Sequence, residues 1–108
     1  MKRGEVNWYE FQSPDKRRPV LILTRTSAIQ FLNEVTIAPV TSTIRGIPSE
    51  VILRIEDGMQ QDCAINFDHI QTVPKIKLGR LITSLSMEKM AEVNSAVCFA
   101  LGIDDPLA

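Results

Sequence analysis

Two short segments combine residue types that can bind a phosphate group. The first is KRRPVLIL (16–23), in which three cations precede a proline and a run of aliphatic residues. The second is APVTSTIRG (38–46), in which an apolar segment ends in three hydroxyl residues followed by Arg45. A guanidinium offers a bidentate fork to phosphate oxygens, and threonine adds a neutral donor that costs little to bury. A guanidinium near hydroxyls is what a phosphodiester site needs.

Composition alone favours simpler roles for both segments. Charges commonly decorate a solvated strand end, and Ser and Thr hydroxyls commonly satisfy the backbone of a turn. Glycine-rich phosphate loops, zinc-ligand spacings and GxSxG elbows are absent from the sequence, and no metal or other cofactor is expected. The single histidine, His69, excludes a two-histidine acid–base site. Pairing His69 with Cys63 or Cys98 is formally possible, but the apolar contexts of both thiols raise their pKa.

The elements that must position these residues are short strands. Apolar segments separated by turn residues predict strands over 5–11, 19–25, 34–40, 50–56 and 63–67. The unbroken aliphatic run after Pro19 predicts a strand that is buried on both faces. Short strands joined by brief loops favour a small antiparallel β-barrel over a βαβ sheet.

The end of the chain changes to a helical period. Ser86 is a candidate N-cap and Gly102 a candidate stop, which predicts a helix over 87–101. Asn94 is expected as a buried amide in the middle of the apolar face that packs on the barrel. That predicted face consists of Met87, Met90, Ala91, Val97, Cys98 and Leu101.

Length and composition predict one globular domain over residues 1–108. Apolar residues make up 44% of the 108 residues and charged residues 23%, which is typical of a folded chain. No apolar run approaches the roughly 20 residues of a membrane helix, and the N-terminal residues do not read as a signal peptide. A cytoplasmic location and packed free thiols at Cys63 and Cys98 are therefore expected.

The net charge of −1 conceals an uneven distribution. Residues 1–25 carry six Lys/Arg and three Asp/Glu, whereas the rest of the chain carries six and ten. The protein is therefore not a bulk polyanion binder, and any contact with nucleic acid must come from a local patch.

Five blocks of the sequence, taken in order, carry a resemblance to a known family. They are RGEVNWYEF, RRPVLIL, IAPVTSTIRGIPSEVIL, DGMQQDCAINFDHIQTV and LITSLSMEKMAEVNSAVCFALGI. They resemble the MazF/PemK-type (Kid-like) toxins, the endoribonuclease half of bacterial type II toxin–antitoxin pairs. The resemblance covers nearly the whole chain and implies a small SH3-like/CcdB-like antiparallel β-barrel with a C-terminal helix, usually as a homodimer.

The resemblance also implies an activity. The family cleaves single-stranded RNA at short sequences without a metal, as the 2′-hydroxyl attacks the adjacent phosphate to leave a 2′,3′-cyclic phosphate and a 5′-hydroxyl. The family's catalytic arginine precedes the proline of the second strand and falls on Arg18, and its catalytic threonine falls on Thr41. Arginine is a poor proton donor, so Arg18 is expected to stabilise phosphorane charge. Thr41 is expected to bind a phosphate oxygen or position the 2′-hydroxyl.

Further residues are expected to bind RNA: Lys16, Arg17, Ser42, Arg45, Asp68 and His69. The three cations would position phosphates and give affinity rather than specificity. Asp68 and His69 stand where the family has an acid–Gln pair that contacts bases, and either is a candidate general base. Trp8 and Tyr9 must point to opposite faces of a strand, so at most one can stack on RNA, and core packing is favoured for Trp8.

The sequence departs from the family pattern in one loop, and the resemblance also implies binding partners. Only QSPDK (12–16) stands where many family members have a longer glycine-rich loop, so a cleavage sequence cannot be carried over. The resemblance implies a cognate antitoxin with a disordered, often acidic tail, and operator DNA bound only through the antitoxin complex. Two alternatives stay open, namely a CcdB-like toxin that binds DNA gyrase without chemistry and a degenerate module for antitoxin or operator binding.

Overall fold

The computed structural model describes residues 1–12, 17–103 and 105 of the chain. Lys16 lies outside the described residues, so its predicted role is not placed. The strands are β1 (Glu5–Glu10), β2 (Arg17–Ile22), β3 (Glu34–Thr41), β4 (Glu50–Leu53), β5 (Cys63–Asn66), β6 (Gln71–Pro74) and β7 (Leu78–Ser84). The helices are α1 (Thr26–Ile29) and α2 (Met87–Leu101), with 3₁₀ turns η1 (Ile55–Asp57), η2 (Phe67–His69) and η3 (Lys75–Lys77).

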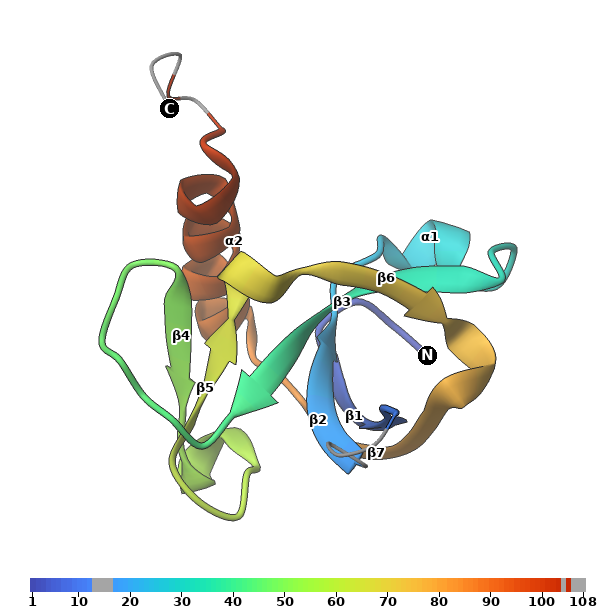
Figure 1. Cartoon of the computed structure of the whole chain (residues 1–108), viewed down its shortest axis with the longest axis horizontal. Coiled ribbons are helices and arrows are strands. Elements are labelled where there is room, and N and C mark those ends of the chain that lie inside the picture. Colours follow the sequence, from blue (N-terminus) through green and yellow to red (C-terminus); the bar gives the residue numbers. More distant parts are fainter. Residues whose placement is uncertain (13–16, 104, 106–108) are drawn as a thin grey trace.

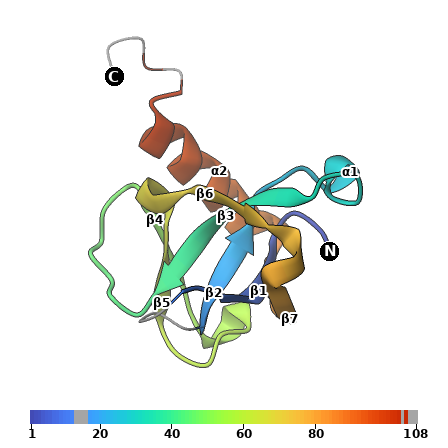
Figure 2. The ribbon, with the colours of Figure 1, turned by 45° about the vertical axis from the view of Figure 1, so that its right-hand side comes forward.

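The seven strands form one strongly curved antiparallel sheet (Figure 1). Their order is β4-β5-β3-β2-β1-β7, and β6 also pairs with β3. β3 organises the sheet, because it pairs with β2 and also with both β5 and β6. The sheet curls into a partly open barrel beside which α2 stands (Figure 2). The predicted small antiparallel barrel with a C-terminal helix is confirmed.

The aliphatic run of β2 is buried on both faces, as its sequence predicts. Val20, Leu21 and Ile22 are all completely buried. Leu21 belongs to the larger core cluster, which includes residues of α2, whereas Val20 and Ile22 belong to a second cluster on the other face. Both faces of the β2–β3 pair therefore contact apolar cores.

The helix begins and ends where the sequence predicts, and it packs through a face that only partly matches the predicted one, since Met90 and Val97 do pack against the main core. The Ser86 hydroxyl accepts a hydrogen bond from the Lys89 N–H at 3.1 Å, and Gly102 closes the helix with φ 68°. Val93 and Ala96 are the helix residues buried against the barrel, whereas Met87 is 88% exposed. Apolar residues surround most of this helix, so periodicity could not select the small residues that allow close packing.

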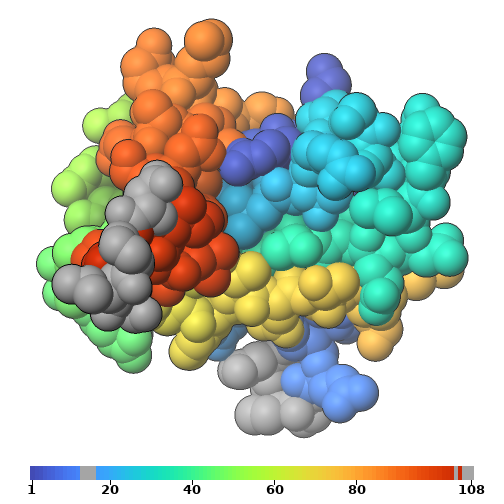
Figure 3. All heavy atoms as spheres, turned by 90° about the horizontal axis from the view of Figure 1, so that it is seen from above, coloured from blue at the N-terminus to red at the C-terminus, as the bar shows by residue number. Residues whose placement is uncertain are grey.

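Asn94 is exposed and does not belong to the packed face. Its Oδ1 accepts a hydrogen bond from Arg3 Nη2 at 3.1 Å, and the Arg3 backbone N–H donates to Thr26 Oγ1 at 3.1 Å. The N-terminal residues consequently lie between α2 and the α1 region, which is visible from above (Figure 3).

The predicted strand over 50–56 ends early. The alternation of apolar and polar residues in 50–56 predicts that Ile55 points inward, but β4 stops at Leu53 and η1 follows, so Ile55 is 69% exposed. The turn forms because Asp57 Oδ2 accepts a hydrogen bond from the Arg54 N–H at 2.8 Å. The sequence also gave no prediction of β6 or β7, although β7 lies along β1 in an irregular register.

The segment after η1 is held against β7 by a close backbone approach. Gly58 has φ +99°, and a Cβ at this position would lie 2.2 Å from Thr83 Oγ1 and 2.6 Å from Thr83 Cβ. The Thr83 hydroxyl donates to the Asp57 carbonyl at 2.9 Å. Only glycine fits here, because both the dihedral angle and the space exclude a side chain.

Gly58→Ala is expected to lower the free energy of unfolding by about 2–4 kcal/mol, since it combines left-handed backbone strain with overpacking. Gly46→Ala is the matched control, because Gly46 has φ +70° but nothing within 4 Å of the added Cβ. It should lose only roughly 1–2 kcal/mol. Urea unfolding followed by circular dichroism measures both, and equal losses would contradict the packing argument.

Candidate active site

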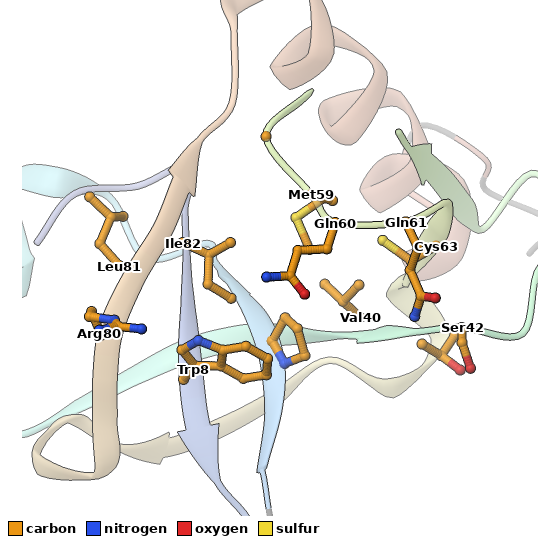
Figure 4. Close-up of a pocket in the computed structure, with 13 residues that line it drawn as sticks. Trp8, Val40, Ser42, Met59, Gln60, Gln61, Cys63, Arg80, Leu81 and Ile82 are labelled. Atoms are coloured by element: carbon orange, nitrogen blue, oxygen red, sulfur yellow. The ribbon is translucent and has the colours of Figure 1, made fainter. Parts of the chain in front are cut away.

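A cavity of about 350 Å³ opens where the ends of β2 and β3 meet β1, β7 and the segment after η1 (Figure 4). Its apolar surface comes from Pro19, Val40, Met59 and Ile82, and Cys63 also lines it. Its polar and aromatic lining comes from Trp8, Thr41, Ser42, Gln60, Gln61 and Arg80. The cavity therefore contains two of the residues selected from the sequence, Thr41 and Ser42.

The two predicted catalytic residues lie at the adjoining ends of β2 and β3. The pairing of these strands ends with Val20 opposite Pro39, so Arg18 and Thr41 each lie two residues beyond the last pair. Because side chains alternate along a strand, both residues fall on the face of the sheet that Val20 and Pro39 share. Arg18 is half-buried and does not line the cavity, whereas its neighbour Pro19 does.

The Thr41 side chain forms a hydrogen bond with the backbone of the loop that follows β3. It is half-buried, and its Oγ1 accepts a hydrogen bond from the Thr43 N–H at 3.1 Å. The hydroxyl hydrogen is not used in that bond and can be donated to an acceptor such as a phosphate oxygen. Ser42, which is exposed, adds a second hydroxyl on the cavity wall.

Arg17 and Trp8 form a stacked pair at the edge of the cavity. The Arg17 guanidinium carbon lies 4.7 Å from the centre of the Trp8 ring, within range of a cation–π interaction. Trp8 is half-buried and lines the cavity, so the favoured assignment of this residue to the core is wrong. Tyr9 is 5% exposed and packs on Phe11 in the second core, which confirms that the two aromatic residues point to opposite faces.

The remaining predicted residues form a separate group held by Glu50 and Ser49. Glu50 Oε1 accepts hydrogen bonds from the backbone N–H groups of Arg45 at 2.9 Å and Gly46 at 3.1 Å. The Ser49 hydroxyl donates to Asp68 Oδ2 at 2.6 Å. Arg45 and Asp68 are therefore anchored near the start of β4 and do not line the cavity.

β5 pairs with the strands that carry both groups of residues and therefore gives the distance between them. Ala64 pairs with Thr41, and Asn66, two residues farther along the strand, pairs with Glu50, so the groups are separated by about 7 Å along β5. His69 is exposed, and its Nδ1 lies 3.4 Å from Asn66 Nδ2. The structure thus places Thr41 and Ser42 on the cavity wall, Arg17 on Trp8 at the edge of the cavity and Arg18 next to Pro19. Arg45, Asp68 and His69 do not line the cavity.

Sequence reasoning missed three polar residues of the cavity. Gln60 and Gln61 are exposed residues that follow the DG turn, where two adjacent amides in a segment leading to a buried strand were the available signal. Arg80 lies on β7, and no strand was predicted there. Arg80 reaches the cavity through the pairing of β7 with β1, and the two glutamines reach it from the segment after η1, and local sequence displays neither arrangement.

Cys63 lines the cavity but is unsuited to act as a nucleophile. Burial raises the pKa of its thiol, and the carboxylates of Asp62 and Asp57 raise it further, so the thiolate is disfavoured at neutral pH. The expected free state of Cys63 and Cys98 is confirmed. Among residues 1–12, 17–103 and 105, no group of three or more His, Cys, Asp or Glu side chains could hold a metal ion.

The fold and this site define a small antiparallel β-barrel with a partly polar cavity at its strand ends, and comparison with known proteins identifies the family. Residues 2–101 match the family described as PemK-like, MazF-like toxin of type II toxin-antitoxin system, and the chain belongs to that family. It is 39% identical over 90 residues to Endoribonuclease MazF3 of Mycobacterium tuberculosis (strain ATCC 25618 / H37Rv), covering 83% of this chain and 87% of the relative. Probable endoribonuclease MazF5 of the same strain is 37% identical over 102 residues, covering 94% and 89%.

Solved structures show the same fold. The Mycobacterium tuberculosis toxin MazF-mt6 superposes with a TM-score of 0.86 at 35% identity, covering 93% of this chain and 98% of that one. An endoribonuclease in complex with its cognate antitoxin from Mycobacterial species gives a TM-score of 0.86 at 26% identity, covering 98% and 99%. The predicted family, fold and enzyme class are confirmed: this is a MazF-type endoribonuclease toxin. None of the helices in the described part of the chain is long and apolar enough to cross a membrane.

The raised pKa of the Cys63 thiol predicts slow alkylation. In the folded protein, iodoacetamide should modify the half-buried Cys98 before the buried Cys63, and the rate at Cys63 should keep rising as the pH increases above neutral. Mass spectrometry of time points measures both rates, and urea-unfolded protein is the control in which the two rates should converge. Faster modification of Cys63 in the folded state would show that its thiol is exposed or activated.

Proposed function

We propose that the protein cleaves single-stranded RNA by attack of a 2′-hydroxyl on the adjacent phosphodiester, without a metal ion. The P–O5′ bond breaks, leaving a 2′,3′-cyclic phosphate and a 5′-hydroxyl. The observation that supports the proposal is a cavity large enough for part of a nucleotide, which is lined by Thr41 and by Pro19, the residue next to Arg18. Family membership and the endoribonuclease relatives support it.

Arg18 stabilises the charge of the phosphorane in this proposal. Its guanidinium can donate two parallel hydrogen bonds to phosphate oxygens, and the β2 backbone before Pro19 restricts where it sits. Pre-positioned donors contribute most where charge develops in the transition state. The half-buried position of Arg18 limits the water that would otherwise weaken this interaction.

Thr41 acts beside Arg18 as a neutral donor to a phosphate oxygen or as a positioner of the 2′-hydroxyl. Its bond from the Thr43 N–H fixes the oxygen while leaving the hydroxyl hydrogen available. Ser42 and Arg17 contact the RNA next to this point. Arg45, Asp68 and His69 contact it farther along β5, where the anchored carboxylate of Asp68 and the exposed imidazole meet neighbouring nucleotides.

An antitoxin controls the activity in this proposal. One structural relative was solved in complex with its cognate antitoxin, and a Deinococcus radiodurans complex has the MazE-MazF composition. We extend this arrangement to the present chain, with an acidic segment of the antitoxin covering the cationic site and operator DNA bound only through the complex. The toxin itself is proposed to act as a homodimer.

Incubation with single-stranded RNA in EDTA should give fragments with 2′,3′-cyclic phosphate and 5′-hydroxyl ends. Arg18→Ala should reduce the cleavage rate by roughly 10²–10³-fold, because it removes the donor to the developing charge. Arg25→Ala is the matched control, since Arg25 is an exposed arginine outside the proposed site, and it should cleave at the wild-type rate. Single-turnover kinetics with end analysis measures each variant.

The outcomes separate the candidate functions. Uncut RNA with the wild-type protein would reject the enzyme proposal and favour a toxin that acts by binding, for which Arg18 would be unimportant. Loss of the folded circular-dichroism spectrum in Arg18→Ala would show a structural role for this side chain, and wild-type cleavage by that variant would remove it from the mechanism.

Thr41→Ala should also slow cleavage, but only by roughly 5- to 12-fold, since it removes one neutral hydrogen bond of about 1–1.5 kcal/mol. Thr41→Ser keeps the hydroxyl and the bond from the Thr43 N–H, so it should recover most of the lost rate. Equal rates for the alanine and serine variants under single-turnover conditions would show that the hydroxyl takes no part.

A further inference from the structure

The cavity beside Thr41 has a lining that differs from a plain phosphate site. Val40, Met59 and Ile82 provide an apolar surface, Trp8 provides an indole, and Gln60 and Gln61 provide two primary amides. These groups come from β1, β3, β7 and the segment after η1 (Figure 4). No carboxylate lines this cavity among the described residues, so nothing in it repels an anionic strand.

We infer that this cavity is a nucleobase subsite, in which one unpaired base of the RNA stacks on Trp8 while Gln60 and Gln61 read its edge. The inference rests on the proposed function, because Thr41 on the cavity wall places the base next to the cleaved phosphate. It assigns sequence selection to residues distinct from those proposed for the chemistry. Proteins commonly read single-stranded RNA through unstacked bases held on aromatic side chains and bonded along their edges.

Trp8 is fixed before any base arrives. The Arg17 guanidinium 4.7 Å from the ring centre covers one face, which leaves the indole positioned but not enclosed. Gly79 of β7 lies close to the backbone of Trp8, since a Cβ there would lie 3.5 Å from Trp8 Cβ and 3.4 Å from the Trp8 carbonyl oxygen. A stacking platform fixed in this way loses little side-chain entropy on binding.

Gln60 and Gln61 belong to the segment after η1, and side-chain interactions anchor this segment at both ends. At its start, Lys89 Nζ lies 3.7 Å from Asp57 Oδ2, and Met59 is buried in the main core. At its end, Arg54 Nη1 donates to Asp62 Oδ2 at 2.8 Å. The side chains of Gln60 and Gln61 consequently extend from a backbone whose position is restrained.

An amide suits a base edge because it carries a donor and an acceptor side by side. Gln60 directs its amide toward Trp8, and Gln61 directs its amide toward Ser42 (Figure 4). A base that stacks on the indole therefore meets one amide at its edge and the other near the hydroxyls. Paired donor and acceptor groups discriminate between bases, since a mismatched edge leaves buried polar groups without partners.

The single tryptophan of the chain makes binding directly observable. Four 2′-O-methyl hexanucleotides, one of each base, lack the attacking hydroxyl and should quench Trp8 fluorescence by stacking. One of the four should bind most tightly. Gln60→Ala or Gln61→Ala should weaken binding of that oligonucleotide by roughly 5- to 100-fold while changing the other three little. Gln30→Ala, an exposed glutamine outside the cavity, is the matched control and should bind as the wild type does.

Cleavage mapping on a long transcript gives the second readout. The glutamine variants should relax the base preference at one position next to the cut while leaving the 2′,3′-cyclic phosphate and 5′-hydroxyl ends unchanged. Equal binding of all four oligonucleotides, or unchanged affinity and cut sites in both variants, would overturn the subsite while leaving the proposed function intact. Base-selective quenching by a protein that cuts no RNA would support the subsite and reject the proposed function.

Discussion

The register between β2 and β3 is the constraint on which the candidate site depends. Val20, Leu21 and Ile22 are completely buried against two different cores, so neither face of β2 can be exchanged for the other. A slip of one residue would turn every side chain of the strand to the opposite face. Such a slip would also turn the Arg18 side chain to the opposite face, although Arg18 does not contribute to the cores. The apolar packing thus fixes the geometry of polar residues at the strand ends.

β3 extends this constraint to the rest of the molecule. Its first half pairs with β6 and its last residues pair with β5, so Thr41 lies where the chain leaves the curved sheet. The loop that follows is anchored by the Glu50 carboxylate, and the segment after η1 is anchored by the close contact of Gly58 with Thr83. The site is consequently assembled from strand ends and short segments whose positions are set by buried neighbours, which suits a site that must be pre-organised.

The sequence predicts what local pattern controls. The aliphatic run of β2, the Ser86 cap and the Gly102 stop each follow from a few adjacent residues, and the proline after Arg18 marks a strand entry. What depends on long-range pairing was not predictable. Arg80 reaches the cavity only because β7 lies along β1, and the face of α2 is chosen by the space the barrel leaves, which periodicity cannot show on a helix that is apolar on most sides. The prediction for Trp8 is wrong because an aromatic residue on a strand has the same local sequence pattern whether its side chain borders a core or a cavity.

The residues proposed for the chemistry and those proposed for base recognition lie on different kinds of structural element, so substitutions at the two sets should affect folding differently. Arg18 and Thr41 lie at the ends of paired strands, where a shift of either would disturb the two cores. Gln60 and Gln61 extend from a connecting segment, where a side chain can be replaced without altering the register. The net charge of −1 means that binding cannot depend on a general attraction to RNA and must come from these local contacts. On the proposed subsite, replacement of the amides would redirect base preference at small cost in folding, whereas a change at the strand ends would disturb the two cores.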